Sequence, residues 1–268
     1  MKRAFVAAIV AILLAIPSAA IAESPDHASV PVYMSLGDSL STGVGASMPA
    51  QTGYVPLFHE YLRRNHSCEG RGAAEGCAAL RLESIGVSGA TTTTLLRDQL
   101  PLALAELEAR NQDANPRNDV EVITIDIGGN DAFPLLQVCG GGVTAECAAA
   151  IQETFTRIAQ NLTLTLTQLR AAAGPDTEII VMTYYNPLPG CVFAPFAPLG
   201  DLILEGGPGL PAGLNDIIRA IAAGVDASVA ETFGRLGVED LVGGSDCLHA
   251  DDSGYEIIAD AFAQAHPD

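Results

Sequence analysis

The sequence predicts an α/β domain, a three-layer sandwich in which helices cover both faces of a central parallel sheet of about five strands. Strongly apolar runs, typical of buried strands, alternate along the chain with segments whose apolar residues recur every three or four positions, as in amphipathic helices. Strands that are separated by helices pair in parallel through right-handed crossovers. The 268 residues, 49% of them hydrophobic, suffice for one core, and no internal repeat or second domain is evident.

The expected elements follow this alternation in chain order. Apolar runs predict strands at 30–36, 80–85, 120–127 and 178–184, and a short strand at 238–242. Helical spacing predicts helices at 54–64, at 91–110 with a break at Pro101, and at 148–173, 212–233 and 253–265. The least regular segment is 185–212, which is rich in proline and in large apolar residues.

Segment 148–173 contains both a strand pattern and a helix pattern. Leu and Thr alternate over 162–167, which alone is typical of an exposed strand. The wider segment has apolar residues at helical spacing: Ile151, Phe155, Ile158, Leu162, Leu166 and Leu169. Because a helix is also needed between the third and fourth strands, we expect this segment to be helical.

The first 22 residues have the three parts of a secretory signal peptide. Lys2 and Arg3 precede an apolar run at 5–16, and Ala20-Ile21-Ala22 is a typical cleavage site. The apolar run is about a dozen residues long, whereas a membrane-spanning helix needs about 20, which disfavours an uncleaved anchor. We therefore expect a signal peptide at 1–22, a flexible leader at 23–29, one domain at 30–268, and a secreted protein with no stable membrane anchor.

The chain is strongly acidic. It has 13 Lys and Arg against 32 Asp and Glu, a net charge of −19. Such a chain repels nucleic-acid phosphates and anionic membrane surfaces. We expect a monomer that acts on a small-molecule or lipid substrate and binds no nucleic acid.

Six cysteines in an exported chain are expected to form disulfides. Loop spacing favours one connectivity among several: Cys68–Cys77, Cys139–Cys147 and Cys191–Cys247. Zinc binding is the alternative, but there is no C-x-x-C, and the spacing around Cys68, Cys77 and His66 matches no common zinc finger. We expect no metal site.

A candidate nucleophile follows the first predicted strand. Gly37-Asp38-Ser39-Leu40 leaves the strand directly, so the Ser39 hydroxyl would lie at the carboxyl edge of the sheet, where ligands bind in open parallel sheets. Taken alone, these residues are more typical of a turn.

A hydrolytic serine needs a base and a carboxylate that orients it. His249 is the best placed of the five histidines, because the others lie in the leader, among charged residues at a helix, or near the C-terminus. Asp246, three residues earlier, could accept the Nδ1 proton and leave Nε2 as the base. Alternatively, Asp246 caps a turn and His249 is a surface residue.

Donors for an oxyanion are also needed. Gly128-Gly129-Asn130-Asp131 ends the third predicted strand and supplies the Asn130 amide. Gly89, after the second strand, has a backbone N–H that can approach closely because glycine lacks a Cβ. Each motif alone is compatible with a turn or a helix start, but together these motifs are more specific.

This set resembles the SGNH hydrolases, also called GDSL esterases and lipases, over nearly the whole chain after the leader. The matching blocks, in order and spacing, are Gly37-Asp38-Ser39-Leu40, Gly89, Gly128-Gly129-Asn130-Asp131 and Asp246-x-x-His249. One departure is Ala250, which stands where proline commonly follows the histidine. Three loop-closing disulfides also resemble those of secreted actinobacterial members.

The resemblance implies a flavodoxin-like fold and a cofactor-free carboxylic ester hydrolase. It implies that Ser39 is the nucleophile, His249 the base and Asp246 the residue that orients it. The N–H of Ser39, Gly89 and Asn130 would form the oxyanion hole. No other hydrolase, metal or nucleotide motif is present: G-x-S-x-G, H-E-x-x-H, a P-loop and G-x-G-x-x-G after a strand are all missing.

The sequence does not distinguish among several classes of substrate. Segment 185–212 could form an apolar acyl-binding wall or lid, or a proline-stiffened surface loop held by Cys191. Lipid esters (including lysophospholipids), short esters, thioesters and acetylated carbohydrates all remain candidates. A different class also remains, a carbohydrate- or surface-binding member that has lost catalysis.

Overall fold

The computed structural model describes residues 30–66, 79–140 and 142–266. The predicted signal peptide and leader and the predicted Cys68–Cys77 pair lie outside these residues. Within them, five parallel strands form one sheet in the order β2-β1-β3-β4-β5. The strands are β1 Val32–Gly37, β2 Arg81–Ser84, β3 Val120–Asp126, β4 Glu178–Met182 and β5 Ser228–Ala230.

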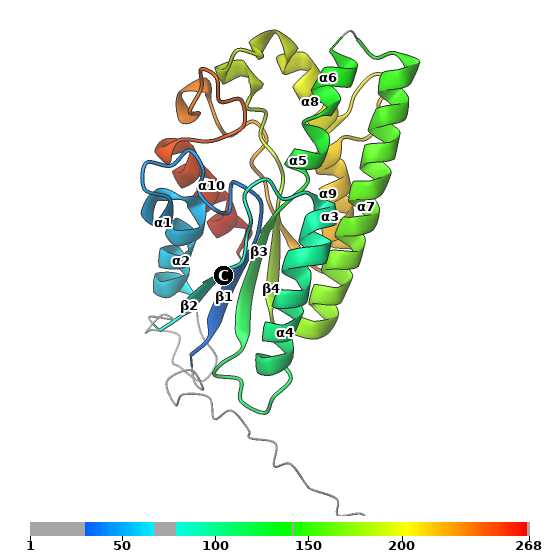
Figure 1. The fold of residues 1–268 in the computed structure, drawn as a ribbon. Helices are drawn as coiled ribbons and strands as arrows, with labels where there is room; N and C mark the ends of the chain where they lie inside the picture. The colour runs from blue at the N-terminus through cyan, green and yellow to red at the C-terminus, as the bar shows by residue number, and fades with distance from the viewer. Residues whose placement is uncertain (1–29, 67–78, 141, 267–268) are drawn as a thin grey trace, which may run out of the picture.

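Helices cover both faces of the sheet, which confirms the predicted three-layer α/β fold (Figure 1). One face carries α2 (Tyr54–Asn65) and α10 (Asp252–Ala265), with the short α1 (Pro49–Thr52) beside them. The other carries α4 (Leu100–Arg110), α7 (Ala145–Ala173) and α9 (Leu214–Ala223). No helix in these parts of the chain is long and apolar enough to cross a membrane.

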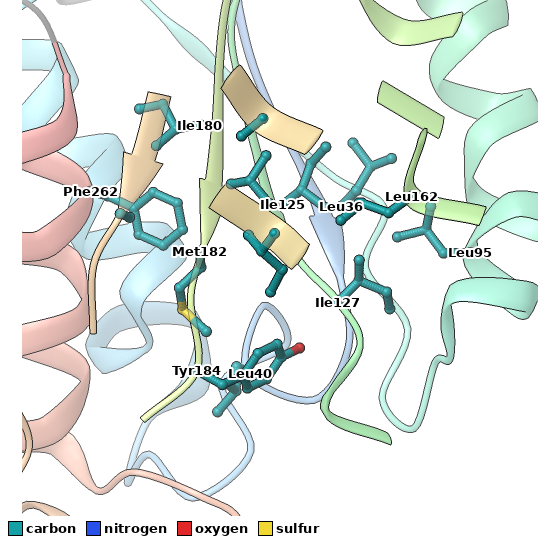
Figure 2. Close-up of a cluster of buried hydrophobic side chains, with 14 of the residues drawn as sticks. Leu36, Leu40, Leu95, Ile125, Ile127, Leu162, Ile180, Met182, Tyr184 and Phe262 are labelled. Atoms are coloured by element: carbon teal, nitrogen blue, oxygen red, sulfur yellow. The ribbon is translucent and has the colours of Figure 1, made fainter. Parts of the chain in front are cut away.

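The core is built from the strands, which are apolar on both faces because both faces are covered. Every residue of β1 is buried, as are six of the seven residues of β3. Figure 2 shows Phe262 of α10 near Ile180 and Met182, and Leu95 and Leu162 near Leu36 and Ile125. The sheet is therefore packed from both sides.

Helix α7 forms where the helical spacing predicts it. The six apolar residues from Ile151 to Leu169 that carry this spacing are all buried. The helix begins at Ala145, slightly earlier than expected, because the Thr144 hydroxyl accepts the N–H of Cys147 at 3.2 Å and caps the first turn.

The predicted break at Pro101 is wrong. The helix runs through Pro101, and the irregularity lies before it: α3 (Thr92–Thr94) leads into a π-helical turn at Leu95–Gln99 and then into α4. Pro101 lies in the first turn of α4, so its missing N–H is tolerated there. The π turn also directs Gln99 inward, where its amide contacts the backbone of Gly37.

The predicted helix at 212–233 and strand at 238–242 are also wrong. Helix α9 ends at Ala223, followed by Gly224 and by Asp226 in the left-handed region with φ of 55°. This turn lets the chain return as β5, which pairs with β4. The segment predicted as the last strand contains a 3-10 turn at Val238–Asp240 instead.

The structure also contains short helices that no periodicity indicated. They are α5 (Gly129–Ala132), α6 (Leu135–Cys139) and, inside the irregular segment 185–212, 3-10 turns at Leu188–Gly190 and Ala194–Phe196 and helix α8 (Ala197–Glu205). Two disulfides link this region, Cys139–Cys147 between α6 and α7 and Cys191–Cys247 between the loops that precede α8 and α10. These are two of the three predicted pairs.

Candidate active site

Ser39 lies in the tight turn that follows β1 and is 8% exposed. The turn depends on Gly37, which has a φ of +150° and packs so closely on Asp126 at the end of β3 that a Cβ would overlap that side chain. Because β1 and β3 are neighbours in the sheet, this contact fixes Ser39 at the carboxyl edge of the sheet.

The structure brings Ser39, His249 and Asp246 together over a separation of more than 200 residues. The Ser39 Oγ lies 2.9 Å from Nε2 of His249, and Nδ1 of His249 lies 2.8 Å from Oδ2 of Asp246. With Nδ1–H donating to the carboxylate, Nε2 is left to accept the Ser39 proton. This is the geometry of a serine nucleophile with its base and orienting acid.

Asp246 is held by its own loop. Its Oδ1 accepts the backbone N–H of Leu248 at 2.9 Å and that of His249 at 3.0 Å. Partial burial opposes ionisation, but the hydrogen bonds from the His249 ring and from these two amides outweigh it, and the pKa of Asp246 is lower than usual. The acid is thus ionised at neutral pH.

The loop that carries His249 is tied to the segment after β4. The Cys191–Cys247 disulfide joins them covalently. The Tyr185 hydroxyl donates to the Leu248 carbonyl at 2.7 Å, one residue before His249. The position of His249 therefore depends on contacts with a segment about 60 residues earlier in the chain.

Asn130 and Gly89 lie on two segments that a hydrogen bond joins. Asn130 stands in α5, directly after β3, and lines the pocket in front of Ser39. Its Nδ2 donates to the carbonyl of Ala90 at 3.0 Å, which orients the amide and ties it to the residue after Gly89. Gly89 does not line this pocket.

We expected glycine at position 89 because its lack of a Cβ would let the backbone N–H approach a ligand closely, but the structure gives a different reason. Gly89 has a φ of +80°, while a Cβ there would meet nothing within 4 Å. Its left-handed backbone conformation, not lack of space, is what favours glycine. The loop is fixed from the other side by Asp131, whose carboxylate accepts both the N–H and the hydroxyl of Thr92 at 2.7 and 2.9 Å.

Sequence reasoning missed a buried carboxyl pair beneath Ser39. Asp38 is 2% exposed and Asp126 is fully buried. Oδ2 of Asp126 accepts the N–H of Asp38 at 3.0 Å, and Oδ1 of Asp38 accepts the N–H of Leu40 at 3.0 Å. The two amides that flank the Ser39 N–H are thus both fixed by carboxyl groups.

Two tyrosine hydroxyls donate hydrogen bonds to these two carboxyl groups. Tyr184 donates to Oδ2 of Asp38 at 2.7 Å, and Tyr54 donates to Oδ1 of Asp126. Burial, followed by the charge of Asp38, holds the pKa of Asp126 well above its usual range, which favours the protonated form of this carboxyl. The one feature of the sequence that could have indicated this pair is the aspartate in the otherwise apolar run Ile125-Asp126-Ile127.

An apolar pocket opens beside Ser39. One wall comes from α5, α6 and Phe133 between them, and the other comes from the segment after β4. The apolar lining residues are Leu40, Ala132, Phe133, Leu136, Pro187, Leu188, Ile203, Leu204, Leu214 and Leu248, with Tyr184 and Tyr185. Residues 185–188, with Gly200, Ile203 and Leu204, are the part of segment 185–212 that lines this pocket.

The other described histidines lie away from Ser39. His59 contacts the carbonyl of Leu80 at 2.8 Å. His66 and His266 contact each other at the amino ends of the strands, next to Glu121 and Glu178. In the described ranges, no group of three or more His, Cys, Asp or Glu side chains could hold a metal ion.

Comparison with known proteins agrees with this geometry. A model of the GDSL-like lipase/acylhydrolase family matches residues 35–257. No curated protein matches the chain significantly. Among solved structures, similar folds are a lipase from a goat rumen metagenome (20% identity, TM-score 0.59, 88% of this chain and 97% of that chain) and an acetylxylan esterase from Geobacillus stearothermophilus (17%, 0.57, 90% and 95%). A phospholipase A1 from Streptomyces albidoflavus is also similar (20%, 0.55, 89% and 100%).

Proposed function

The chain belongs to the GDSL-like lipase/acylhydrolase family, and on this basis we propose that it hydrolyses carboxylic esters through an acyl-enzyme on Ser39. The observation that carries the proposal is the hydrogen-bonded series from Ser39 Oγ to His249 to Asp246, with contacts of 2.9 and 2.8 Å. A serine becomes nucleophilic when an adjacent base can take its proton.

In the first step, His249 Nε2 accepts the hydroxyl proton as Ser39 Oγ bonds to the ester carbonyl carbon. The carbonyl electron pair moves onto oxygen, and the N–H groups of Ser39 and Gly89 and the Asn130 amide stabilise this oxyanion. The oxyanion electron pair then re-forms the carbonyl as the bond to the alcohol oxygen breaks, and His249 donates its proton to the departing alkoxide. Asp246 stays ionised throughout and stabilises the imidazolium.

In the second step, water takes the place of the alcohol. His249 accepts a proton from water, and the resulting hydroxide bonds to the acyl carbon. The tetrahedral species collapses, the carboxylic acid leaves, and the proton returns to Ser39. The proton taken from Ser39 leaves with the alcohol, and the proton taken from water returns to Ser39. No cofactor takes part in this scheme.

A fluorophosphonate probe tests the nucleophile directly, because it labels only an activated serine. Wild type should be labelled, and Ser39→Ala should lose labelling and ester hydrolysis while keeping its far-UV spectrum. The losses should be of many orders of magnitude. Ser47→Ala, at an exposed serine eight residues away, is the control and should keep both signals. Loss of only a few-fold activity in Ser39→Ala would disprove the assignment, and absence of labelling in wild type would favour a non-catalytic binding protein.

The apolar pocket supports lipid or medium-to-long acyl esters over acetylated carbohydrates as substrates. Its lining contains ten aliphatic, aromatic or proline residues besides the two tyrosines, where a sugar site would need more hydrogen-bonding groups. Hydrolysis of p-nitrophenyl esters from acetate to palmitate, with matched thioesters and acetylated xylan in parallel, tests this preference. Highest kcat/KM on acetate or on the xylan would contradict it.

We also propose that the protein is exported. The two described disulfides are typical of oxidising compartments, and residues 1–22 have the composition of a signal peptide. Expression in a secreting bacterial host, followed by N-terminal sequencing of the medium fraction, should give a chain that begins near Glu23. Retention of Met1 in a cell-associated protein would contradict export.

A further inference from the structure

Exposed large apolar side chains gather at the edge of the sheet that carries Ser39. Ten such side chains are exposed in the described residues. Eight of them lie on segments that leave the carboxyl ends of the strands: Met48, Val87, Val138, Val143, Val192, Phe193, Val238 and Val242. The other two, Leu102 and Leu164, lie on the flanking helices α4 and α7. Figure 1 shows α6 and α8 extending beyond the sheet at this end.

Five of these eight form what we call the apolar collar: Val138, Val143, Val192, Phe193 and Val242. One half of the collar borders His249. The N–H of Val242 donates to the carbonyl of His249 at 3.1 Å, and the N–H of Val192 donates to the carbonyl of Gly244 at 3.1 Å. Val192 is 66% exposed, so its side chain faces solvent beside the catalytic loop.

The other half of the collar borders α6. The ring of Phe193 contacts that of Phe196, with centroids 6.3 Å apart. Phe196 in turn packs on Gly140, where an added Cβ would lie 3.4 Å from the ring. Val138 stands in α6 directly before this contact. Val143 follows in the loop to α7, where it borders residues 209–212. The turn that carries Phe193 is thus packed against the end of α6.

The collar has no charge of its own. Segments 132–145, 187–200 and 241–245 contain no Asp, Glu, Lys, Arg or His, although 17% of the chain is charged. Anionic lipid surfaces are bound through clusters of Lys and Arg. The absence of such residues here, together with the net charge of −19, excludes an anionic surface and favours an uncharged or zwitterionic one.

The segments that carry the collar also line the substrate pocket. Phe133 and Leu136 from 132–145, and Pro187 and Leu188 from 187–200, face the pocket beside Ser39. The pocket mouth and the collar therefore belong to the same loops. A substrate that moved from an apolar phase into the pocket would pass these uncharged segments.

We propose that the apolar collar adsorbs the protein to the surface of an uncharged or zwitterionic lipid aggregate, with the Ser39 pocket turned toward that surface. Removal of these side chains from water supplies the attraction, since exposed apolar patches on soluble proteins commonly mark interaction sites. The proposal refines the lipid-ester function proposed above, and rests on it for the biological role but not for the binding itself.

Binding is tested in the Ser39→Ala background, so that no hydrolysis alters the lipid. Vesicles of phosphatidylcholine are mixed with this protein, with its Val143→Ser/Val192→Ser/Phe193→Ser variant, and with a Leu102→Ser/Leu164→Ser control, and bound protein is measured by sedimentation. The triple variant should lose about tenfold or more in partition coefficient, since three side chains no longer leave water. The control, which removes equally exposed residues elsewhere, should stay within about twofold. Phosphatidylglycerol vesicles should bind less of every protein.

Activity is measured with Ser39 present. The triple variant should hydrolyse an emulsified long-chain ester several-fold more slowly and a soluble short ester at the wild-type rate, which also shows that it is folded. The proposal is overturned if the parent does not bind phosphatidylcholine, or if triple variant and control bind equally. A Ser39→Ala protein that binds vesicles normally but still cleaves esters would instead refute the proposed function and leave the collar assignment intact.

Discussion

The side chain of Asp126, at the end of β3, accepts the backbone N–H of Asp38, the residue that precedes Ser39. This single contact joins two neighbouring strands at the point where the candidate nucleophile emerges. Since Asp38 in turn fixes the N–H of Leu40, the Ser39 N–H lies between two amides that are already paired. The oxyanion donor proposed at Ser39 is thus held in place before any substrate binds.

Replacement of Asp126 by Asn tests its protonation. A carboxyl whose pKa is raised on folding stays protonated in the folded state while it ionises in the unfolded state, so wild-type stability falls as pH rises above about 4. Asn is a neutral isostere that can accept from Asp38 and donate to Tyr54. The free energy of unfolding of Asp126→Asn relative to wild type should therefore increase from pH 4 to pH 8. A difference that does not change with pH would show that folding does not raise the pKa of Asp126.

Asp246→Asn should lower kcat on a soluble ester by about 10³- to 10⁴-fold without preventing folding, because the imidazolium loses its stabilising charge.

The contribution of Asp246 to stability should change with pH in the opposite direction to that of Asp126. The pKa of Asp246 is lowered on folding, so the stability it contributes is present above about 4 and is lost as pH falls below that value. Urea unfolding of both proteins at pH 3 and pH 7 measures this. Equal losses of stability on substitution at the two pH values would contradict it.

The Cys191–Cys247 disulfide should affect turnover as well as stability. It joins the loop of His249 to the segment that forms one pocket wall, and catalytic groups must be held within about half an ångström of productive geometry. Cys191→Ser/Cys247→Ser should lower kcat on a soluble ester at a temperature where the protein is folded.

The matched control is Cys139→Ser/Cys147→Ser. Removal of either disulfide should cost about 2 to 4 kcal/mol of stability, but the control should alter Tm more than kcat. If the Cys191/Cys247 variant melts earlier and yet turns over at the wild-type rate, the bond stabilises the fold without positioning the base.

Ile203→Trp should shorten the range of acyl chains that the enzyme accepts. Ile203 is buried in α8 and lines the pocket, so a larger ring would occupy its space. We expect kcat/KM to fall at least tenfold for decanoate or longer esters and to change little for acetate. Leu202→Trp, on the same helix but outside the pocket lining, is the control and should keep the wild-type chain-length profile. Equal losses on acetate and decanoate would place the acyl chain elsewhere.

The parts of the fold and site that sequence predicts are those with a local signal. Ser39 and His249 stand in motifs of a few residues, and the apolar spacing of α7 is long enough to overrule the Leu-Thr alternation within it. β5 was missed because it has only three residues, and because the apolar spacing of 212–223 continues past Gly224 into the turn at Asp226.

The buried network beneath Ser39 has no local signal. Tyr184 and Asp38 are 146 residues apart, and Tyr54 and Asp126 are 72 apart. Each of these residues alone is compatible with an ordinary turn or strand, and only the packing of the strands brings their polar groups together. Their pairing is a property of the sheet order, which a single sequence does not specify.

The π-helical turn at Leu95–Gln99 gives the helix one more residue than an α-helical path of the same span would hold. Through it, the amide of Gln99 both accepts from the N–H and donates to the carbonyl of Gly37, at 2.9 and 2.8 Å. Loss of a single residue from this turn would restore a regular helix and rotate one side of it against the other by about 100°. A one-residue deletion here would thus leave the helix intact and damage the turn that carries Ser39, which makes chain length, and not only residue type, a constraint on this site in evolution.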